Sequence, residues 1–145
     1  MIDDSFSIFV EKLRNNKIGY SIDCDKVLKI DCWRNDIAII LSNLIDNSIY
    51  WLKEHTDNTK KCISVSVAET AEAIILNFKD NGPGISEDNI TTGIIFDPGY
   101  STKPDGTGLG LALAGEASAR NNGKLVAHYT DSGAYFQLTF DKMGK

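Results

Sequence analysis

Residues 97–114, DPGYSTKPDGTGLGLALA, change character abruptly, and the rest of the chain is best interpreted outward from them. Glycine and proline recur up to Gly110, and good helix formers follow at once. A glycine-rich segment that begins a helix presents unpaired backbone N–H groups at the positive end of the helix dipole, and glycine lacks the Cβ that would keep an anion away. The stretch therefore predicts an anion-binding helix N-terminus beside a mobile loop over residues 97–106.

Two common nucleotide-binding patterns do not describe this stretch. No Gly-Lys-Ser/Thr follows the glycines, which excludes a P-loop. No strand leads straight into them within a βαβ unit, which excludes the dinucleotide-binding fingerprint. Other segments of the chain must therefore indicate which anion this helix N-terminus binds.

Composition limits the possible functions. The chain has 145 residues, of which 42% are apolar, and this suits one domain with one core. A net charge of −5 argues against a general affinity for nucleic acid or anionic membrane. No apolar run reaches the roughly 20 residues of a membrane-spanning helix, and Asp3 and Asp4 stand where a secretory signal would be basic. Three cysteines without a CxxC pair are typical of buried thiols in a reducing compartment. We expect a cytoplasmic domain that contacts neither nucleic acid nor membrane directly.

Hydrophobic periodicity predicts the order of the elements. Helices are expected over 4–14, 35–55 and 107–121, with a short one over 86–95. Extended segments are expected over 20–24 and 27–31, and β-hairpins over 62–78 and 124–141. Because strands cluster and helices cluster, the fold class is α+β: a two-layer α/β sandwich with one mixed, mostly antiparallel sheet and helices packed on one face. The expected organisation is a single domain over 1–145, with an N-terminal helix and connection over 1–19.

A pair of asparagines lies on the long helix. Asn43 and Asn47 are four residues apart, so both lie on one helical face, offset from the apolar stripe. An amide oxygen there can be a ligand for Mg²⁺, which prefers oxygen donors. The structural alternative is a pair of amides that cap or bridge neighbouring groups. The stripe itself comprises Ile37, Leu41, Leu44, Ser48 and Leu52.

A carboxylate and two glycines follow a predicted strand in DNGPGI, residues 80–85. Asp80 at the strand end can accept hydrogen bonds from a ligand amine, and Gly82 and Gly84 let a ligand approach the backbone closely. A sharp turn with an Asx cap is the structural alternative.

Four segments together resemble the sequence boxes of histidine-kinase ATP-binding domains. LSNLIDNSIYWL (41–52) resembles the N box, DNGPGI (80–85) the first glycine box, IFDPGYSTK (95–103) the F box, and GTGLGLALA (106–114) the second glycine box. These domains belong to the GHKL superfamily, with DNA gyrase, MutL and the large heat-shock chaperones. The resemblance covers about residues 20–141. It implies that ATP and Mg²⁺ bind between a sheet-side loop and a flexible lid over 97–106.

The resemblance also implies individual roles. It makes Asn47 the Mg²⁺ ligand, Asp80 the group that recognises the adenine amine, and Phe96 the aromatic residue at the start of the lid. Asn43 and Lys103 are the candidate catalytic residues, since Lys103 matches a lysine that can reach the γ-phosphate. The other implied nucleotide-binding residues are Tyr50, Lys53, Gly82, Gly84, Ile85, Thr102, Gly106, Thr107, Gly108, Leu109 and Gly110.

Three positions depart from the family pattern. Tyr50 stands where many histidine kinases have a basic residue, so a phosphate contact is lost or moved to Lys53 or Lys103. Gly99 stands where an aromatic residue is common, which predicts a looser lid. Ala134 stands where a threonine often lies near adenine, which predicts one weaker secondary contact.

The leading hypothesis is the ATP-binding catalytic domain of a sensor histidine kinase. It would transfer the γ-phosphoryl group, with Mg²⁺, to a histidine on a dimerisation domain absent from this chain, with a response regulator downstream. Neither His55 nor His128 has the flanking pattern of that acceptor. A GHKL ATPase acting as a conformational clamp is a second hypothesis, but such enzymes activate water with a glutamate where this chain has Asn43. A nucleotide-binding module without catalysis is the third, and Tyr50 and Gly99 leave it open.

Overall fold

The computed structural model describes residues 2–24, 34–54, 60–101 and 108–141. Five strands form one sheet in the order β1-β2-β3-β5-β4, in which β1 runs parallel to β2 and every other neighbouring pair is antiparallel. The prediction of a mixed, mostly antiparallel sheet is confirmed. The strands are β1 (Gly19–Asp23), β2 (Cys62–Glu69), β3 (Ala73–Asp80), β4 (Gly123–His128) and β5 (Tyr135–Asp141).

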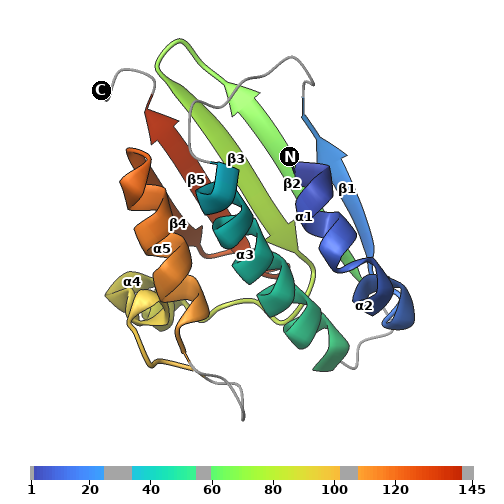
Figure 1. Cartoon of the computed structure of the whole chain (residues 1–145). Helices are drawn as coiled ribbons and strands as arrows, with labels where there is room; N and C mark the ends of the chain where they lie inside the picture. The colour runs from blue at the N-terminus through green and yellow to red at the C-terminus, as the bar shows by residue number, and fades with distance from the viewer. Residues whose placement is uncertain (1, 25–33, 55–59, 102–107, 142–145) are drawn as a thin grey trace.

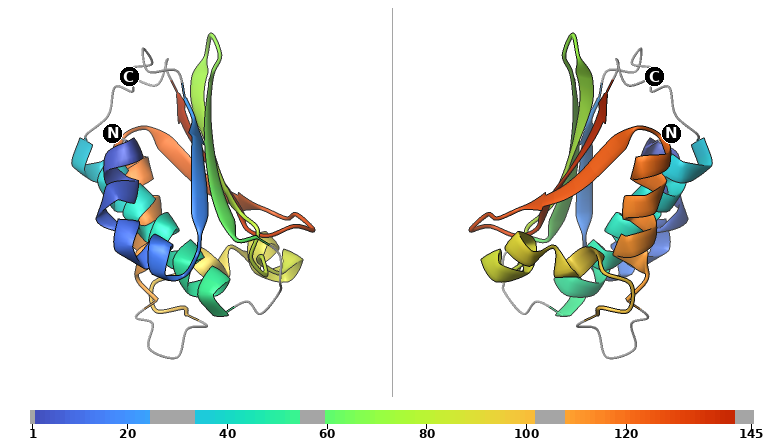
Figure 2. Two further views of the ribbon diagram at one scale, coloured as in Figure 1. Left: turned by 90° about the vertical axis from the view of Figure 1, so that its right-hand side faces the viewer. Right: turned by 90° about the vertical axis from the view of Figure 1, so that its left-hand side faces the viewer.

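The helices form a second layer on one face of this sheet, and the opposite face carries none among the described residues (Figure 2). The short helix α4 (Glu87–Thr92) and the 3-10 helix η1 (Ile94–Phe96) lie at one end of the two layers (Figure 1). The predicted two-layer α/β sandwich is confirmed. The helices of the layer are α1 (Ile2–Ile8), α2 (Val10–Asn15), α3 (Arg34–Glu54) and α5 (Gly110–Arg120).

Some element boundaries differ from those predicted. The helix expected over 4–14 is two helices separated at Phe9, whose N–H donates to the carbonyl of Phe6 in a tighter turn (N···O 3.0 Å). The helix expected from 107 starts at Gly110, and the side chain of the preceding residue, Leu109, cannot cap it. The extended segment expected over 27–31 lies outside the described residues.

The core lies between the two layers. Side chains alternate along β3 and β5, so that Phe78, Phe136 and Leu138 point toward the helices and are fully buried. All five residues of the predicted stripe on α3 are buried as well. One of them, Ser48, is polar, and a buried hydroxyl requires a hydrogen-bond partner. This partner belongs to the site described below.

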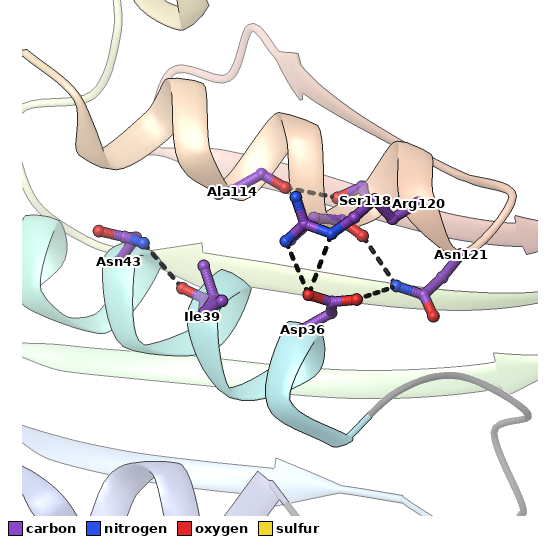
Figure 3. Close-up of polar contacts among 8 residues, drawn as sticks. Asp36, Ile39, Asn43, Ala114, Ser118, Arg120 and Asn121 are labelled. Carbon is purple, nitrogen blue, oxygen red and sulfur yellow. Dashed lines mark hydrogen bonds and ion pairs between the residues drawn. The ribbon is translucent and has the colours of Figure 1, made fainter.

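Helices α3 and α5 pack against each other in opposite directions. The first turn of α3 meets the last turn of α5, where Arg120 donates two hydrogen bonds to Asp36 Oδ1 (2.7 Å from Nη2 and 3.3 Å from Nε). Asn121 Nδ2 donates to Asp36 Oδ2 (3.0 Å) and to the carbonyl of Ala117 (2.9 Å) (Figure 3). We call Asp36, Arg120 and Asn121 the clasp. Both oxygens of a buried carboxylate are thus hydrogen-bonded at the end of the helix pair.

The clasp makes stability depend on pH. The hydrogen bond from Arg120, and next that from Asn121, holds the pKa of Asp36 below its ordinary value. A lowered folded pKa contributes stability that is present above the unfolded pKa, about 3.9, and is lost as the pH falls through the folded pKa. We therefore expect Asp36→Asn to be less stable than the parent chain at neutral pH, with a smaller loss of stability below about pH 4. Urea unfolding at several pH values measures this, and Asp88→Asn, at an exposed carboxylate of α4, is the control. If the free energy of unfolding of Asp36→Asn fell as steeply on acidification as that of the parent chain, Asp36 would not be the source of this pH dependence.

Two further expectations concern the surface. Among the described residues, no helix is both long and apolar enough to cross a membrane. The expectation of buried thiols is wrong for Cys62, which is exposed at the start of β2, while Cys24 is half-buried. Cys62 alternates with Ile63 along the strand and lies on the face of the sheet that the helices leave open.

Candidate functional site: a cleft at one end of the helix pair

A cleft of about 1220 Å³ lies where α3 ends and α5 begins, close to the loop that follows β3. All four sequence segments singled out above contribute residues to its lining. Its lining includes Asn43, Asn47, Tyr50, Lys53, Gly84, Ile85, Tyr100, Gly108, Leu109 and Gly110. All of these except Tyr100 are predicted site residues, so the structure brings together side chains from positions far apart in the chain.

The two asparagines of α3 lie in different environments. Asn43 Nδ2 donates to the carbonyl of Ile39 one turn earlier (2.8 Å), so its oxygen faces the start of α5. A Cβ added to Gly110 would lie 2.9 Å from Asn43 Oδ1, closer than ordinary contacts allow. Glycine at this position therefore lets the N-terminus of α5 approach Asn43. Asn47 is half-buried in the cleft, and within the described residues its amide makes no hydrogen bond.

Asp80 lies beneath the cleft, at the last position of β3, with 8% of its surface exposed. Its carboxylate accepts three hydrogen bonds. Ser48 Oγ donates to Oδ2 (2.6 Å), and the backbone N–H groups of Gly82 (3.0 Å) and Ala134 (3.1 Å) donate to Oδ1. Three donors hold this carboxylate in one orientation, and a carboxylate can only accept further hydrogen bonds.

Close backbone approach around Asp80 depends on glycine. Gly133 has a φ of +124°, and a Cβ there would overlap the carbonyl oxygen of Asp80 at 1.9 Å. Gly84 has a φ of +82°, and its added Cβ would lie 3.0 Å from the carbonyl oxygen of Gly133. Ala134 contacts Asp80 through its backbone, since its carbonyl also accepts from the Asp80 N–H (3.0 Å). These contacts with Asp80 therefore do not depend on the side chain at 134.

The two ends of the glycine-rich segment are joined. The N–H of Gly99 donates to the carbonyl of Gly108 (3.0 Å), and both residues have positive φ, +89° and +74°. A Cβ on Gly108 would come within 2.3 Å of the Gly99 carbonyl carbon. We call this crossing of residues 99 and 108 the neck. The absence of an aromatic side chain at Gly99 predicts a looser lid, but the backbone of Gly99 is itself held by this hydrogen bond to Gly108.

Some predicted site residues do not line the cleft. Phe96 is half-buried and packs its ring edge-on against Phe136, with centroids 6.4 Å apart. Gly82 is buried beneath the cleft, where its added Cβ would meet Asp80 Oδ1 at 3.3 Å. The remaining predicted residues lie outside the described residues: Thr102, Lys103, Gly106 and Thr107.

Three residues contribute to the site but are not predicted from the sequence: Ser48, Gly133 and Asn81. The helical pattern places Ser48 only in the apolar stripe, although a serine among buried aliphatic residues is itself a signal of a buried polar partner. The pattern around Gly133 indicates only a turn. Asn81 has no predicted role, yet its Oδ1 accepts from the N–H of Cys62 (2.8 Å) and its Nδ2 donates to the carbonyl of Lys60, which holds the loop after β3 to the start of β2.

Comparison with known proteins adds to this geometry. Residues 34–143 match the family of histidine kinase-, DNA gyrase B- and HSP90-like ATPases. The chain is 36% identical over 98 residues to the sensor histidine kinase TmoS of Ectopseudomonas mendocina, an alignment that covers 67% of this chain and 10% of TmoS. It is 33% identical over 140 residues to the sensor histidine kinase ZraS of Escherichia coli K12, covering 95% of this chain and 29% of ZraS. The chain thus spans less than a third of the length of these relatives.

Among solved structures, the catalytic domain of the histidine kinase ThkA superposes with a TM-score of 0.81 at 26% identity, covering 97% of this chain and 90% of that domain. The same kinase in complex with the response regulator protein TrrA has the same fold in its matching part, with a TM-score of 0.75 at 22% identity. That match covers 98% of this chain and 39% of the ThkA chain.

Proposed function

The chain belongs to the family of histidine kinase-, DNA gyrase B- and HSP90-like ATPases and is an ATP-binding catalytic domain of the histidine-kinase type. From this we propose that it transfers the γ-phosphoryl group of ATP to a histidine side chain. The acceptor would lie on a dimerisation domain outside this chain, and a response regulator would receive the phosphoryl group next. One observation supports this most: the fixed acceptor Asp80 lies beneath the same cleft that the N-terminus of α5 lines. These two groups suit the two ends of ATP.

The proposed binding mode follows from the chemistry of these groups. Asp80 would accept a hydrogen bond from the adenine 6-amino group, for which Oδ2 retains a free lone-pair direction. The glycines at 108 and 110 would leave backbone N–H groups at the start of α5 accessible to phosphate oxygens. Lys53, exposed at the cleft, is available for the phosphate contact that Tyr50 cannot make. In the transfer itself, an imidazole nitrogen of the acceptor forms a bond to the γ-phosphorus as the bond to the ADP oxygen breaks.

Asn47 is the proposed Mg²⁺ ligand. Within the described residues, no three His, Cys, Asp or Glu side chains gather in a way that could hold a metal ion. An amide oxygen with no other described hydrogen bond fits a hard cation that completes its shell with phosphate oxygens and water. When bound, Mg²⁺ would neutralise charge on the triphosphate.

We expect Asn47→Ala to weaken ATP binding in the presence of Mg²⁺ by about tenfold or more, since a ligand to an ionic group contributes about 1.5–3 kcal/mol. Binding of ATP in excess EDTA should change little. Calorimetric titrations under the two conditions provide the comparison. Equal weakening in both would make Asn47 a structural residue instead.

The chain alone is expected to bind ATP and Mg²⁺ without labelling itself. Neither histidine has the predicted acceptor pattern, so incubation with γ-labelled ATP should leave the chain unlabelled. Adding the histidine-bearing domain of a cognate kinase should produce labelled acceptor, and Lys103→Ala should lower that rate. Autoradiography of the separated proteins measures both results. Self-labelling by the isolated chain would contradict the proposal that the acceptor lies elsewhere.

Hydrolysis of ATP by a lone clamp is less well supported. The residue at the position of the water-activating glutamate is Asn43, whose Nδ2 is engaged by Ile39 and whose oxygen faces Gly110. An amide cannot accept a proton from water at neutral pH. Steady turnover by the isolated chain would reverse this assignment.

A further inference from the structure

The relative position of α3 and α5 governs the geometry of the proposed triphosphate site. Asn43 and Asn47 project from α3, whereas Gly108 and Gly110 lie at the start of α5. A sliding or rotation of α5 on α3 would therefore change the distance between the proposed metal ligand and the phosphate-binding N–H groups.

Large side chains contribute little to the core-facing side of α5, where Leu111 is half-buried against the core. The buried residues of α5 that face the core are small: Ala114, Ala117 and Ser118. The Ser118 hydroxyl donates to the carbonyl of Ala114 on its own helix (2.8 Å) and does not hold α3 (Figure 3). Small side chains permit close approach, but they interlock less than large ones do.

The clasp supplies directional contacts at the opposite end of the pair. Arg120 lies ten residues from Gly110, about 15 Å along the helix. Two guanidinium nitrogens and one amide nitrogen hold both oxygens of Asp36, so the carboxylate is fixed from two sides. Its location also suits the helix dipoles, with an anion in the first turn of α3 and a cation in the last turn of α5.

We propose that the clasp of Asp36, Arg120 and Asn121 is a positioning device for the triphosphate end of the nucleotide site. It fixes how α5 lies along α3, and through this rigid helix it holds the N-terminus of α5 against Asn43. This inference rests on the proposed function, because it concerns the phosphates of the bound ATP. The base end, built from Asp80, Gly133 and Ala134, is attached to the sheet and, through Ser48, to α3, and none of these contacts involves α5.

The test compares ATP with adenosine, which has the base but no phosphates. Arg120→Met keeps most of the aliphatic stem and removes the guanidinium. We expect it to bind Mg²⁺–ATP about threefold to thirtyfold more weakly, a range typical of residues that act through a packed network. Adenosine affinity should stay unchanged, and Arg120→Lys should recover part of the ATP affinity. Arg14→Met removes the same charge from an exposed position on α2 and should leave both affinities unchanged.

Calorimetry for ATP and an NMR titration for adenosine, both at a temperature where circular dichroism shows full folding, distinguish the outcomes. If Arg120→Met does not fold, the nearly isosteric Asp36→Asn takes its place. A parallel loss of ATP and adenosine affinity, or no loss in fully folded variants, would overturn the clasp as a positioning device. If the parent chain bound neither ligand, the proposed function would fail instead.

Discussion

Replacing Gly133 with alanine is expected to lower the free energy of unfolding by about 2–5 kcal/mol. Two costs combine at this residue. Its φ of +124° is one that L-residues rarely adopt, and the added Cβ would overlap the Asp80 carbonyl oxygen at 1.9 Å. The neighbouring backbone cannot move without breaking the paired hydrogen bonds between Asp80 and Ala134. Since small domains are stable by about 5–15 kcal/mol, the variant should be close to unfolding.

Urea unfolding followed by circular dichroism measures this loss, and Gly93→Ala is the matched control. Gly93 also has a positive φ, +72°, but a Cβ there would meet nothing within 4 Å. The control should therefore show the backbone cost alone, about 1–2 kcal/mol. Equal losses in the two variants would mean that the approach of Gly133 to Asp80 is not as close as described.

Replacing Asp80 with asparagine is expected to weaken ATP binding by at least about 1.5–3 kcal/mol, or roughly tenfold to a hundredfold. The fold should survive, because the introduced amide can keep its oxygen toward the N–H groups of Gly82 and Ala134 and donate to the Ser48 hydroxyl. The amide nitrogen would then oppose the adenine amine, donor against donor. A purine with a 6-oxo group should gain in relative affinity for the same reason.

Calorimetry with ATP, GTP and ITP tests this expectation. The parent chain should bind ATP and discriminate against GTP and ITP, whose 6-oxo group would face a carboxylate. Asp80→Asn should reduce or reverse that preference, whereas Asp88→Asn on exposed α4 should not alter it. Similar affinities of the parent chain for ATP and GTP would remove Asp80 from adenine recognition.

Local patterns in the sequence predicted most of the fold. The stripe on α3 and the alternation in β2, β3 and β5 repeat with the periods of their elements, so both could be recognised without knowledge of their partners. Boundaries were less well predicted at Phe9 and Gly110, where backbone hydrogen bonding rather than composition sets the end of the helix.

Long-range contacts could not be predicted in the same way. Ser48 and Asp80 are 32 residues apart, and Asp36 and Arg120 are 84 residues apart. Within their own segments these residues have no unusual pattern: Ser48 is a serine on a helix, and Arg120 is an arginine near a helix end. Their roles arise when the sheet and the helix layer bring them together. For the same reason Gly133 gave only a turn signal, since its closest neighbour belongs to another hairpin.

The neck has a consequence for how this domain could be re-engineered. The N–H of Gly99 donates to the carbonyl of Gly108, so a backbone hydrogen bond holds together two residues that are nine positions apart in the chain. Doubling the length of a closed flexible loop costs only about 0.6 kcal/mol. A longer segment inserted after Ser101 should therefore leave in place both this hydrogen bond and the contacts of Tyr100, whose hydroxyl accepts from Asn89 Nδ2 (3.1 Å).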